Sequence, residues 1–273
     1  MSLDTKNLRR VAVTSAAVVA ALESGVAVLA LRKGRRDYAD GAWGPGLAAV
    51  AITGAAVGNG NPWRRWALAA ATTGWAVRLE SLMLGRLRGS EEEDERYTEF
   101  LDGDSTPAVL GKVFLTQALA QLLVSAPIQV AAASRLPDGP RRWLFPAGLA
   151  VMVAGAVGEA TADRQKAAFM IEKKRAKDNG EDAPDVLDTG LWGLSRHPNY
   201  FGDSVVWDGA WIASAASAPA VWTFPAPVAM SYFLIYATGA KRTEKKMEQR
   251  PAYRDYQQRV AFFFPRPSSR ART

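Results

Sequence analysis

Long apolar segments alternate with short polar loops along the chain. A helix needs about 20 mostly apolar residues to cross the hydrocarbon core of a bilayer, which is about 30 Å thick. The apolar segments are residues 11–31, 44–58, 66–87, 113–133, 143–157 and 205–240. Most of them approach or exceed that length, so the pattern predicts a series of membrane-crossing helices.

These segments lack a charged face. A surface helix of a soluble protein carries an apolar stripe on one side and charged residues on the other. Residues 11–31 contain one charged side chain, Glu23, and residues 113–133 contain none. An alanine-rich soluble bundle is the alternative, but its helices would need charges on their outer faces. We therefore predict an all-α membrane helix bundle.

The last apolar segment, residues 205–240, is too long for one span. It contains three prolines, and proline interrupts a regular helix. We expect two helices joined near residues 217–219. The predicted fold is then a single integral membrane domain over residues 1–273, with about seven transmembrane helices.

The average composition hides this pattern. A chain of 273 residues with mean hydropathy −0.09 and pI near 9.7 resembles a basic soluble protein, even a nucleic-acid binder. The hydropathy is low because 49 alanines replace larger apolar residues, and small residues let membrane helices pack closely. From Lys241 onward, ten Lys and Arg face three Asp and Glu, which accounts for the whole net charge of +7. We expect no nucleic-acid partner.

The basic loops predict an orientation, because Lys and Arg are enriched on the cytoplasmic side of membrane proteins. With seven spans, residues 32–36, 86–96 and 163–196 lie on the same side as the basic tail. The C-terminus is then cytoplasmic and the N-terminus lies outside, although three arginines between residues 135 and 142 oppose this bias. Anionic membrane lipids are expected to attract the tail, by about 1 kcal/mol per basic residue.

Cysteine is absent and His197 is the one histidine. These counts exclude disulfides, thiolate nucleophiles and the common Cys- or His-ligated metal sites, so we expect no metal. The chain has neither a dinucleotide-binding glycine motif after a strand nor a P-loop. Loops and helix ends would therefore have to bind any nucleotide.

The densest polar stretch, residues 187–203, directly precedes an apolar segment. Because of Pro198, we expect a turn followed by a helix that begins near Tyr200, with Asn199 as its N-cap. Arg196, His197 and Asn199 are donors suited to phosphate or carboxylate. The alternative is a plain turn at the membrane interface, with an arginine that reaches lipid head groups.

Some charged residues stand within the apolar segments, where they are costly and usually functional. Arg78 and Glu80 share one segment, and Glu159 and Asp163 lie on one face of another helix. The alternative is an internal ion pair that fixes packing. The acidic run that includes Glu91 and Glu92 is expected to be a solvated loop.

The polar stretch and several shorter motifs resemble a known family, the steroid 5-alpha-reductase-like bacterial integral membrane proteins. Its superfamily includes steroid 5-alpha-reductases, which use NADPH, and isoprenylcysteine carboxyl methyltransferases, which use S-adenosylmethionine. The matching motifs are Asp40…Trp43-Gly44, Trp75…Arg78-Leu79, Glu93-Asp94…Arg96-Tyr97, Phe114…Gln117…Gln121, Glu159…Asp163…Gln165, Asp188-Thr-Gly-Leu-Trp…Ser-Arg-His-Pro-Asn-Tyr-Phe-Gly-Asp203 and Glu244…Arg250-Pro…Tyr253…Tyr256…Arg259. The part of the resemblance that is most specific to this family lies in residues 187–259.

The resemblance implies a cofactor pocket in cytoplasmic loops, in the inner membrane of a bacterium. The reductases use a carboxylate and a tyrosine to orient the substrate carbonyl. Asp40 matches the carboxylate, and Trp75, which has no hydroxyl, stands at the tyrosine position. Asp203 replaces the usual glutamate, so steroid specificity is not implied. The cofactor-binding positions that the resemblance and the donor pattern indicate are Arg86, Arg88, Asp163, Arg196, His197, Asn199, Tyr200 and Asp203.

Three functions are compatible with these residues. The first is NADPH-dependent reduction of a lipophilic conjugated carbonyl compound, favoured because arginines are abundant in the cytoplasmic loops. The second is S-adenosylmethionine-dependent methylation of a lipid or prenylated acceptor. It is less favoured because Lys245 follows Glu244 where such methyltransferases tend to carry paired acidic residues. The third is a membrane protein without enzymatic activity.

Overall fold

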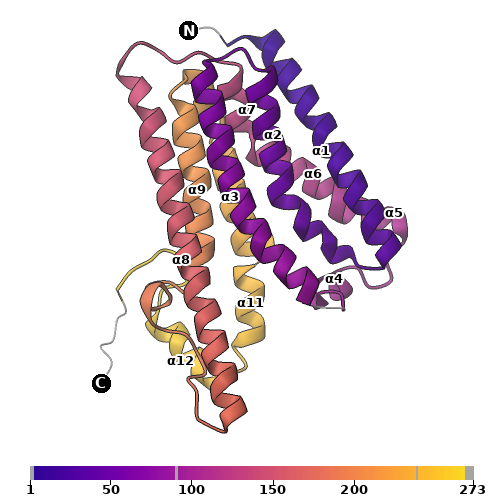
Figure 1. The fold of residues 1–273 in the computed structure, drawn as a ribbon, viewed down its shortest axis with the longest axis vertical. Coiled ribbons are helices and arrows are strands. Elements are labelled where there is room, and N and C mark those ends of the chain that lie inside the picture. Colours follow the sequence, from indigo (N-terminus) through magenta and orange to yellow (C-terminus); the bar gives the residue numbers. More distant parts are fainter. Residues whose placement is uncertain (1–2, 90–91, 238, 268–273) are drawn as a thin grey trace. The chain divides into compact units, whose positions relative to one another are not determined.

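The computed structural model describes residues 3–89, 92–237 and 239–267 (Figure 1). These residues form helices and loops, and none of them is in a β-strand. The predicted all-α class is therefore confirmed.

The chain divides into two compact units, and each is built from two stretches of sequence. The first comprises Met1–Leu149 and Ala210–Ala226, and the second comprises Ala150–Gly209 and Pro227–Thr273. The single integral membrane domain expected from the sequence stays a prediction, because compactness does not show whether either unit folds alone.

The first unit contains the N-terminal helices and the short helix η5. Its elements are α1 (Thr5–Lys33), η1 (Arg36–Ala42), α2 (Trp43–Val57), α3 (Pro62–Gly89), α4 (Glu95–Phe100), α5 (Thr106–Val109), η2 (Leu110–Leu115), α6 (Thr116–Val124), α7 (Ala126–Ala132), η3 (Pro140–Trp143) and η5 (Ala218–Thr223).

The second unit contains most of two long helices and the C-terminal segment. Its elements are α8 (Leu144–Asn179), η4 (Gly190–Gly193), α9 (Pro198–Ala215), α10 (Pro225–Tyr232), η6 (Phe233–Ala237), α11 (Ala240–Met247) and α12 (Pro251–Arg259). The beginning of α8, the last turns of α9 and the first two residues of α10 belong to the first unit.

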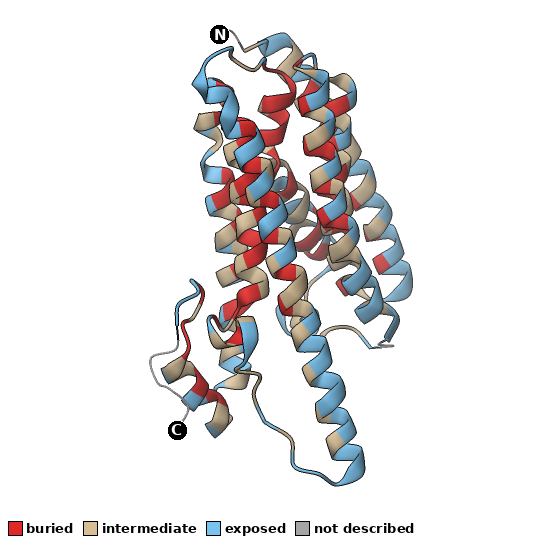
Figure 2. Cartoon of the chain, turned by 60° about the vertical axis from the view of Figure 1, so that its left-hand side comes forward, coloured by how far each residue is buried: buried red, intermediate tan, exposed pale blue. Residues whose placement is uncertain are grey.

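Helix α1 shows why these segments are helical and why both of their faces are apolar. Asp4 caps its start by accepting a hydrogen bond from the Asn7 backbone N–H, and Gly34 ends it with φ of 66°, a conformation that glycine adopts without strain. Buried positions recur along one face, while Val13 and Val28 are exposed on the other. Figure 2 shows the same mixture of buried and exposed positions along the long helices. Exposed apolar side chains suit a helix that faces lipid.

Four helical stretches among the described residues are long and apolar enough to cross a membrane: Thr5–Lys33, Thr106–Val124, Pro140–Asn179 and Ala218–Met247. They indicate an integral membrane protein. About seven spans were expected, but α2 has only 15 residues and α3 carries several charges. The break expected near residues 217–219 is confirmed, because α9 ends at Ala215 and η5 begins at Ala218.

Helices α8 and α9 pack backbone against backbone in the second unit. A Cβ atom added to Gly155 would lie 2.7 Å from the Gly202 carbonyl oxygen, and one added to Gly202 would lie 2.7 Å from the Glu159 backbone nitrogen. Such contacts are shorter than van der Waals distances, so only glycine fits. This packing fixes the start of α9, where the polar motif ends.

Candidate functional site

The polar motif lies where a loop enters α9. The sequence placed the helix start near Tyr200 with Asn199 as N-cap, and this was wrong. The helix begins at Pro198, because the first helical position needs no backbone N–H, and the His197 carbonyl accepts from the Phe201 N–H at 2.9 Å. The Asn199 side chain donates instead to Asp163 Oδ1 at 3.1 Å.

Helix α8 holds one side of this loop. Besides the bond between Asn199 and Asp163, the Trp192 indole N–H donates to the Ala162 carbonyl at 2.9 Å. The Leu191 N–H donates to Gln165 Oε1 at 3.0 Å. Asp163, Ala162 and Gln165 therefore hold the motif loop from α8, whereas the cofactor-binding role expected of Asp163 stays a prediction.

The C-terminal segment holds the other side. Several hydrogen bonds join the two stretches, among them Arg196 N–H to the Ala261 carbonyl (2.8 Å), Ser195 Oγ to the Phe263 carbonyl (2.8 Å), Arg266 N–H to the Leu194 carbonyl (3.0 Å) and Tyr256 hydroxyl to the Trp192 carbonyl (2.6 Å). The motif loop thus lies between α8 and residues 256–266.

Glu244 is the centre of a polar cluster that the sequence did not single out as a site. Its carboxylate accepts from Arg196 Nε at 2.5 Å and Nη2 at 3.1 Å, lies 3.2 Å from His197 Nε2, and accepts from Gln257 at 3.1 Å. Arg196 Nη1 also donates to the Gln257 and Val260 carbonyls. Arg196 thereby uses four of its five N–H groups within the protein. An acidic residue at the start of a basic tail was the signal that could have revealed this partner.

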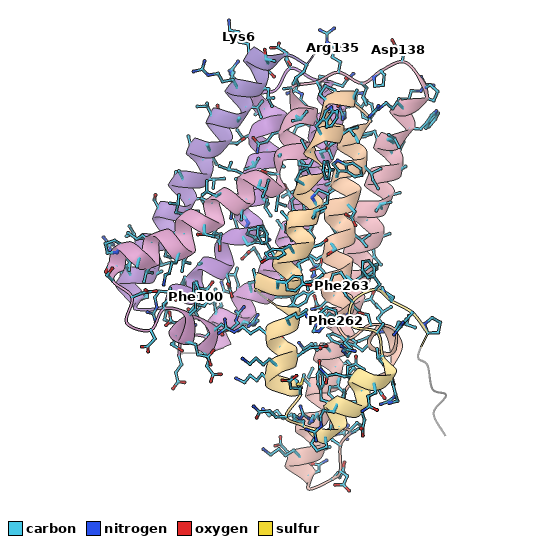
Figure 3. The ribbon with its side chains drawn as sticks, turned by 180° about the vertical axis from the view of Figure 1, so that it is seen from behind. Lys6, Phe100, Arg135, Asp138, Phe262 and Phe263 are labelled. Carbon is cyan, nitrogen blue, oxygen red and sulfur yellow. The ribbon has the colours of Figure 1, made fainter. Side chains whose placement is uncertain are left out.

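Aromatic rings surround the same cluster. His197 stacks on Tyr200, with ring centroids 5.8 Å apart, and meets Phe262 edge-on at 5.3 Å. Gly239 lies against Tyr200, because a Cβ atom there would be 2.5 Å from the ring. Figure 3 shows Phe262 beside Phe263 on the C-terminal segment. Asp203, one turn further along α9 than Asn199, is 5% exposed.

A second polar site lies in the first unit, around Asp40. The Tyr97 hydroxyl donates to Asp40 Oδ1 at 2.7 Å, and Arg96 Nη2 donates to Asp40 Oδ2 at 2.7 Å. Arg96 also pairs with Asp94, which caps α4. Burial, and after it the Asp40 carboxylate, raise the pKa of Tyr97 above its ordinary value.

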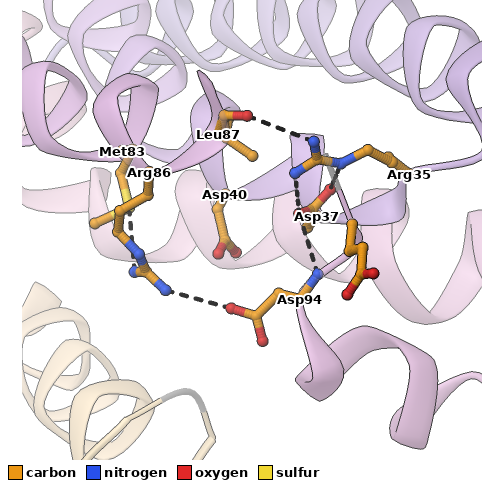
Figure 4. A pocket seen from close by; sticks show the side chains of 8 residues that line it. Arg35, Asp37, Asp40, Met83, Arg86, Leu87 and Asp94 are labelled. Carbon is orange, nitrogen blue, oxygen red and sulfur yellow. Dashed lines mark hydrogen bonds and ion pairs between the residues drawn. The ribbon is translucent and has the colours of Figure 1, made fainter. Parts of the chain in front are cut away.

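This site borders a small cavity of about 120 Å³ (Figure 4). Asp40 and Arg86 both line it, and Arg86 pairs with Asp94 at 3.3 Å. Carboxylates outnumber arginines in its wall. The full lining is Arg35, Asp37, Asp40, Met83, Arg86, Leu87, Glu92 and Asp94.

The other positions taken from the resemblance lie apart from the cavity wall. Trp75 is buried in α3, 2% exposed, and Arg88 is exposed near the end of α3; neither lines the cavity. The hydroxyl that contacts Asp40 comes instead from Tyr97. Glu92 is exposed, as expected of a solvated loop, whereas Glu91 lies outside the described residues.

Comparison with protein families matches residues 27–260 to the family described as "Protein of unknown function (DUF1295)". The chain belongs to the DUF1295 family. The matched region of this DUF1295 protein contains Asp40, Tyr97, the polar motif and Glu244. Both polar sites therefore lie, for the most part, within the part of the chain that the family shares.

Among curated proteins, the DUF1295 chain is similar to an uncharacterised protein of Schizosaccharomyces pombe, with 30% identity over 79 residues. The alignment covers 29% of this chain and 23% of the yeast protein. No solved structure matches the chain. In the described part of the chain, no group of three or more His, Cys, Asp or Glu side chains could hold a metal ion.

Proposed function

We propose that this DUF1295 protein is an NADPH-dependent reductase of a lipophilic compound in which a C=C bond is conjugated to a carbonyl group. The observation that carries the proposal is the hydrogen bond of 2.7 Å from the Tyr97 hydroxyl to Asp40. It provides the pair of a hydroxyl and a carboxylate that the resemblance to steroid 5-alpha-reductases leads one to expect.

The chemistry of this pair suits such a reduction. Adding hydride to the β-carbon of a conjugated carbonyl moves negative charge onto the carbonyl oxygen, and a fixed donor stabilises that charge. Asp40 holds the Tyr97 hydroxyl in place, and the raised pKa keeps the phenol protonated at neutral pH. When a substrate is bound, the Tyr97 hydroxyl can donate its hydrogen bond to the substrate oxygen instead of to the Asp40 carboxylate. Helices with exposed apolar faces give a lipophilic substrate access from the bilayer.

The residues of the second unit fit a nucleotide cofactor. NADPH supplies the hydride when it is bound. The rings of Tyr200 and Phe262 suit its aromatic groups, and His197 and Arg196 suit its phosphates. Asp163 on α8 and Asn199 and Asp203 on α9 carry polar groups that can form hydrogen bonds with the ribose hydroxyls and the amide of the cofactor.

One observation favours a second candidate, S-adenosylmethionine-dependent methyl transfer. The guanidinium of Arg196 is already paired with Glu244, and a cofactor with a sulfonium cation and no phosphate needs no free arginine. Carboxylates and aromatic rings, both present around the motif, attract such a cation.

Cofactor binding to the purified protein in detergent separates these proposals. We expect NADPH to raise the melting temperature, S-adenosylmethionine to leave it unchanged, and Asn199→Ala to weaken the effect of NADPH. Asn179→Ala, at the exposed end of α8, is the matched control and should respond like the wild type. Stabilisation by S-adenosylmethionine alone would overturn the reductase proposal and support the methyltransferase. Stabilisation by neither cofactor would leave a membrane protein without enzymatic activity.

A further inference from the structure

Lys241 is an exposed cation on the aromatic cluster of the second unit. It stands in the first turn of α11, and its Nζ lies 5.4 Å from the ring centroid of Tyr236 and 5.8 Å from that of Phe262. Within residues 3–89, 92–237 and 239–267, no carboxylate forms a salt bridge with it. Among the described residues, the neighbours of the Lys241 ammonium are therefore aromatic faces, which attract a cation weakly at an exposed site.

Arg196 provides the contrast. Its guanidinium carbon lies 5.5 Å from the centroid of Phe262, so Phe262 contacts both cations. The Arg196 side chain is 11% exposed and its charge is compensated by Glu244, whose carboxylate also faces His197. The sequence predicted Arg196, together with His197, among the phosphate-binding donors. The contacts leave Lys241 as the uncompensated cation of this cluster.

We propose that Lys241 binds a phosphate group of the nucleotide cofactor, beside the Phe262 ring. The inference rests on the proposed function, because it requires a nucleotide in the second unit. An ammonium group with three donors and no carboxylate partner is a good phosphate ligand, and an adjacent aromatic ring offers a surface for a base. Lys241 is thus the residue that distinguishes a phosphorylated cofactor from one without phosphate.

A phosphate could also come from the head group of a membrane lipid. The aromatic contacts favour the nucleotide, because Phe262 and the stacked rings of His197 and Tyr200 form one cluster with Lys241. A lipid phosphate would need the cation and not the rings.

The experiment compares Lys241→Gln with Lys245→Gln, which removes an exposed lysine four residues later on the same helix. Dissociation constants are measured by calorimetry in a zwitterionic detergent, with NADPH and with adenosine 2′,5′-bisphosphate as probes. We expect Lys241→Gln to weaken both by about tenfold or more, as for the loss of a hydrogen bond to a charged group. Lys245→Gln should change neither, and Lys241→Arg should restore most of the affinity.

Each other outcome has a distinct meaning. If the wild type binds neither probe, the proposed function fails and the inference fails with it. If the wild type binds and Lys241→Gln binds equally well, or if both glutamine variants lose affinity equally, the inference alone is overturned. The inference is also overturned if Lys241→Gln retains NADPH affinity but loses stabilisation by phosphatidylglycerol nanodiscs, because the phosphate would then be that of a lipid.

Discussion

Single residues decide what the two polar sites can do. Asp40 was expected to orient a substrate carbonyl, with Trp75 at the position of the missing tyrosine. Tyr97 contacts Asp40 although it lies 57 residues further along the chain. A hydroxyl is therefore present beside Asp40, and it comes from α4 and not from α3.

Changing Tyr97 to Phe tests this role. The variant keeps the ring and loses the donor, so we expect NADPH binding to persist while the rate of NADPH oxidation with conjugated carbonyl substrates falls by about 100-fold or more. Tyr38→Phe is the control, because Tyr38 is half-buried in η1 and lies under Arg35. Equal rates for the two variants would show that Tyr97 has no part in the reaction.

Asp94 predicts a dependence of stability on pH. Burial alone would raise the pKa of Asp94, but hydrogen bonds from Arg96 hold it below the ordinary value of 3.8. The folded state therefore gains stability from the ionised group above pH 3.8, and that gain is lost as pH falls through the lower pKa of the folded state. We expect Asp94→Asn to lower stability at pH 7 by about 1 kcal/mol.

Thermal melting in detergent between pH 7 and pH 3 checks this prediction. The difference between wild type and Asp94→Asn should shrink as the pH falls below 3.8, because Asp94 of the unfolded wild type then takes up a proton, and it should disappear below the lower pKa of the folded state. A difference that is constant over this range would show that the charge of Asp94 contributes nothing.

At the scale of elements, α8 and the C-terminal segment hold the motif loop from two sides. One ion pair adds to the hydrogen bonds on the C-terminal side: Arg196 pairs with Glu244 on α11, and Glu244 also accepts from Gln257 on α12; the side chains of Arg196 and Glu244 are 11% and 13% exposed. Removing one partner leaves the other charge poorly solvated. The resulting loss of folding free energy is larger than the net stabilisation that the intact pair provides.

We therefore expect Glu244→Gln to destabilise the attachment of residues 251–266 by about 2 kcal/mol. Limited proteolysis should cut this stretch faster in the variant, whereas Glu248→Gln, an exposed position on the same segment, should behave like the wild type. Arg196→Met combined with Glu244→Gln should recover part of the loss, because neither charge is then left alone. Unchanged proteolysis of Glu244→Gln would refute the role of the pair.

The contact between α8 and α9 predicts opposite effects for two glycines. Gly202→Ala should destabilise the protein, because the new Cβ atom would meet the Glu159 backbone at 2.7 Å. Gly158→Ala, on α8, has no atom within 4 Å of the added Cβ. It should be neutral or stabilising by about 0.5–1 kcal/mol, because alanine favours the helix. Melting temperatures that fall equally in both variants would contradict the close contact.

For the whole molecule, the number of spans decides the position of the termini. Four helical stretches meet the requirements of length and hydropathy in the described residues, whereas the sequence predicts about seven spans. An odd number puts the termini on opposite sides of the membrane, and an even number puts them on the same side.

Reporter fusions at each terminus test the orientation. We expect a fluorescent protein at the C-terminus to fold in the cytoplasm and alkaline phosphatase at the N-terminus to be active outside, because the basic tail favours the cytoplasmic side. Both termini on one side would contradict seven spans. The same experiment with the N-terminal fusion on a chain cut after Lys33, the end of α1, shows whether α1 alone sets the orientation.

The sequence by itself determined the all-α membrane class, the break between α9 and η5 and the location of the polar motif. These properties follow from apolar length, proline positions and composition, all of which are local. It misplaced the start of α9 by two residues, because Pro198 is as suitable at the first helical position as in the preceding turn.

The tertiary structure alone decided the partners: Tyr97 for Asp40, and Glu244 for Arg196, 48 residues away. Among the residues that the structure describes, it paired Arg196 with a carboxylate and left Lys241 beside Phe262 without a salt bridge. No periodicity relates such distant positions. Which donor meets which carboxylate depends on how helices and loops pack, and a charge acquires its role only from the neighbours that packing gives it.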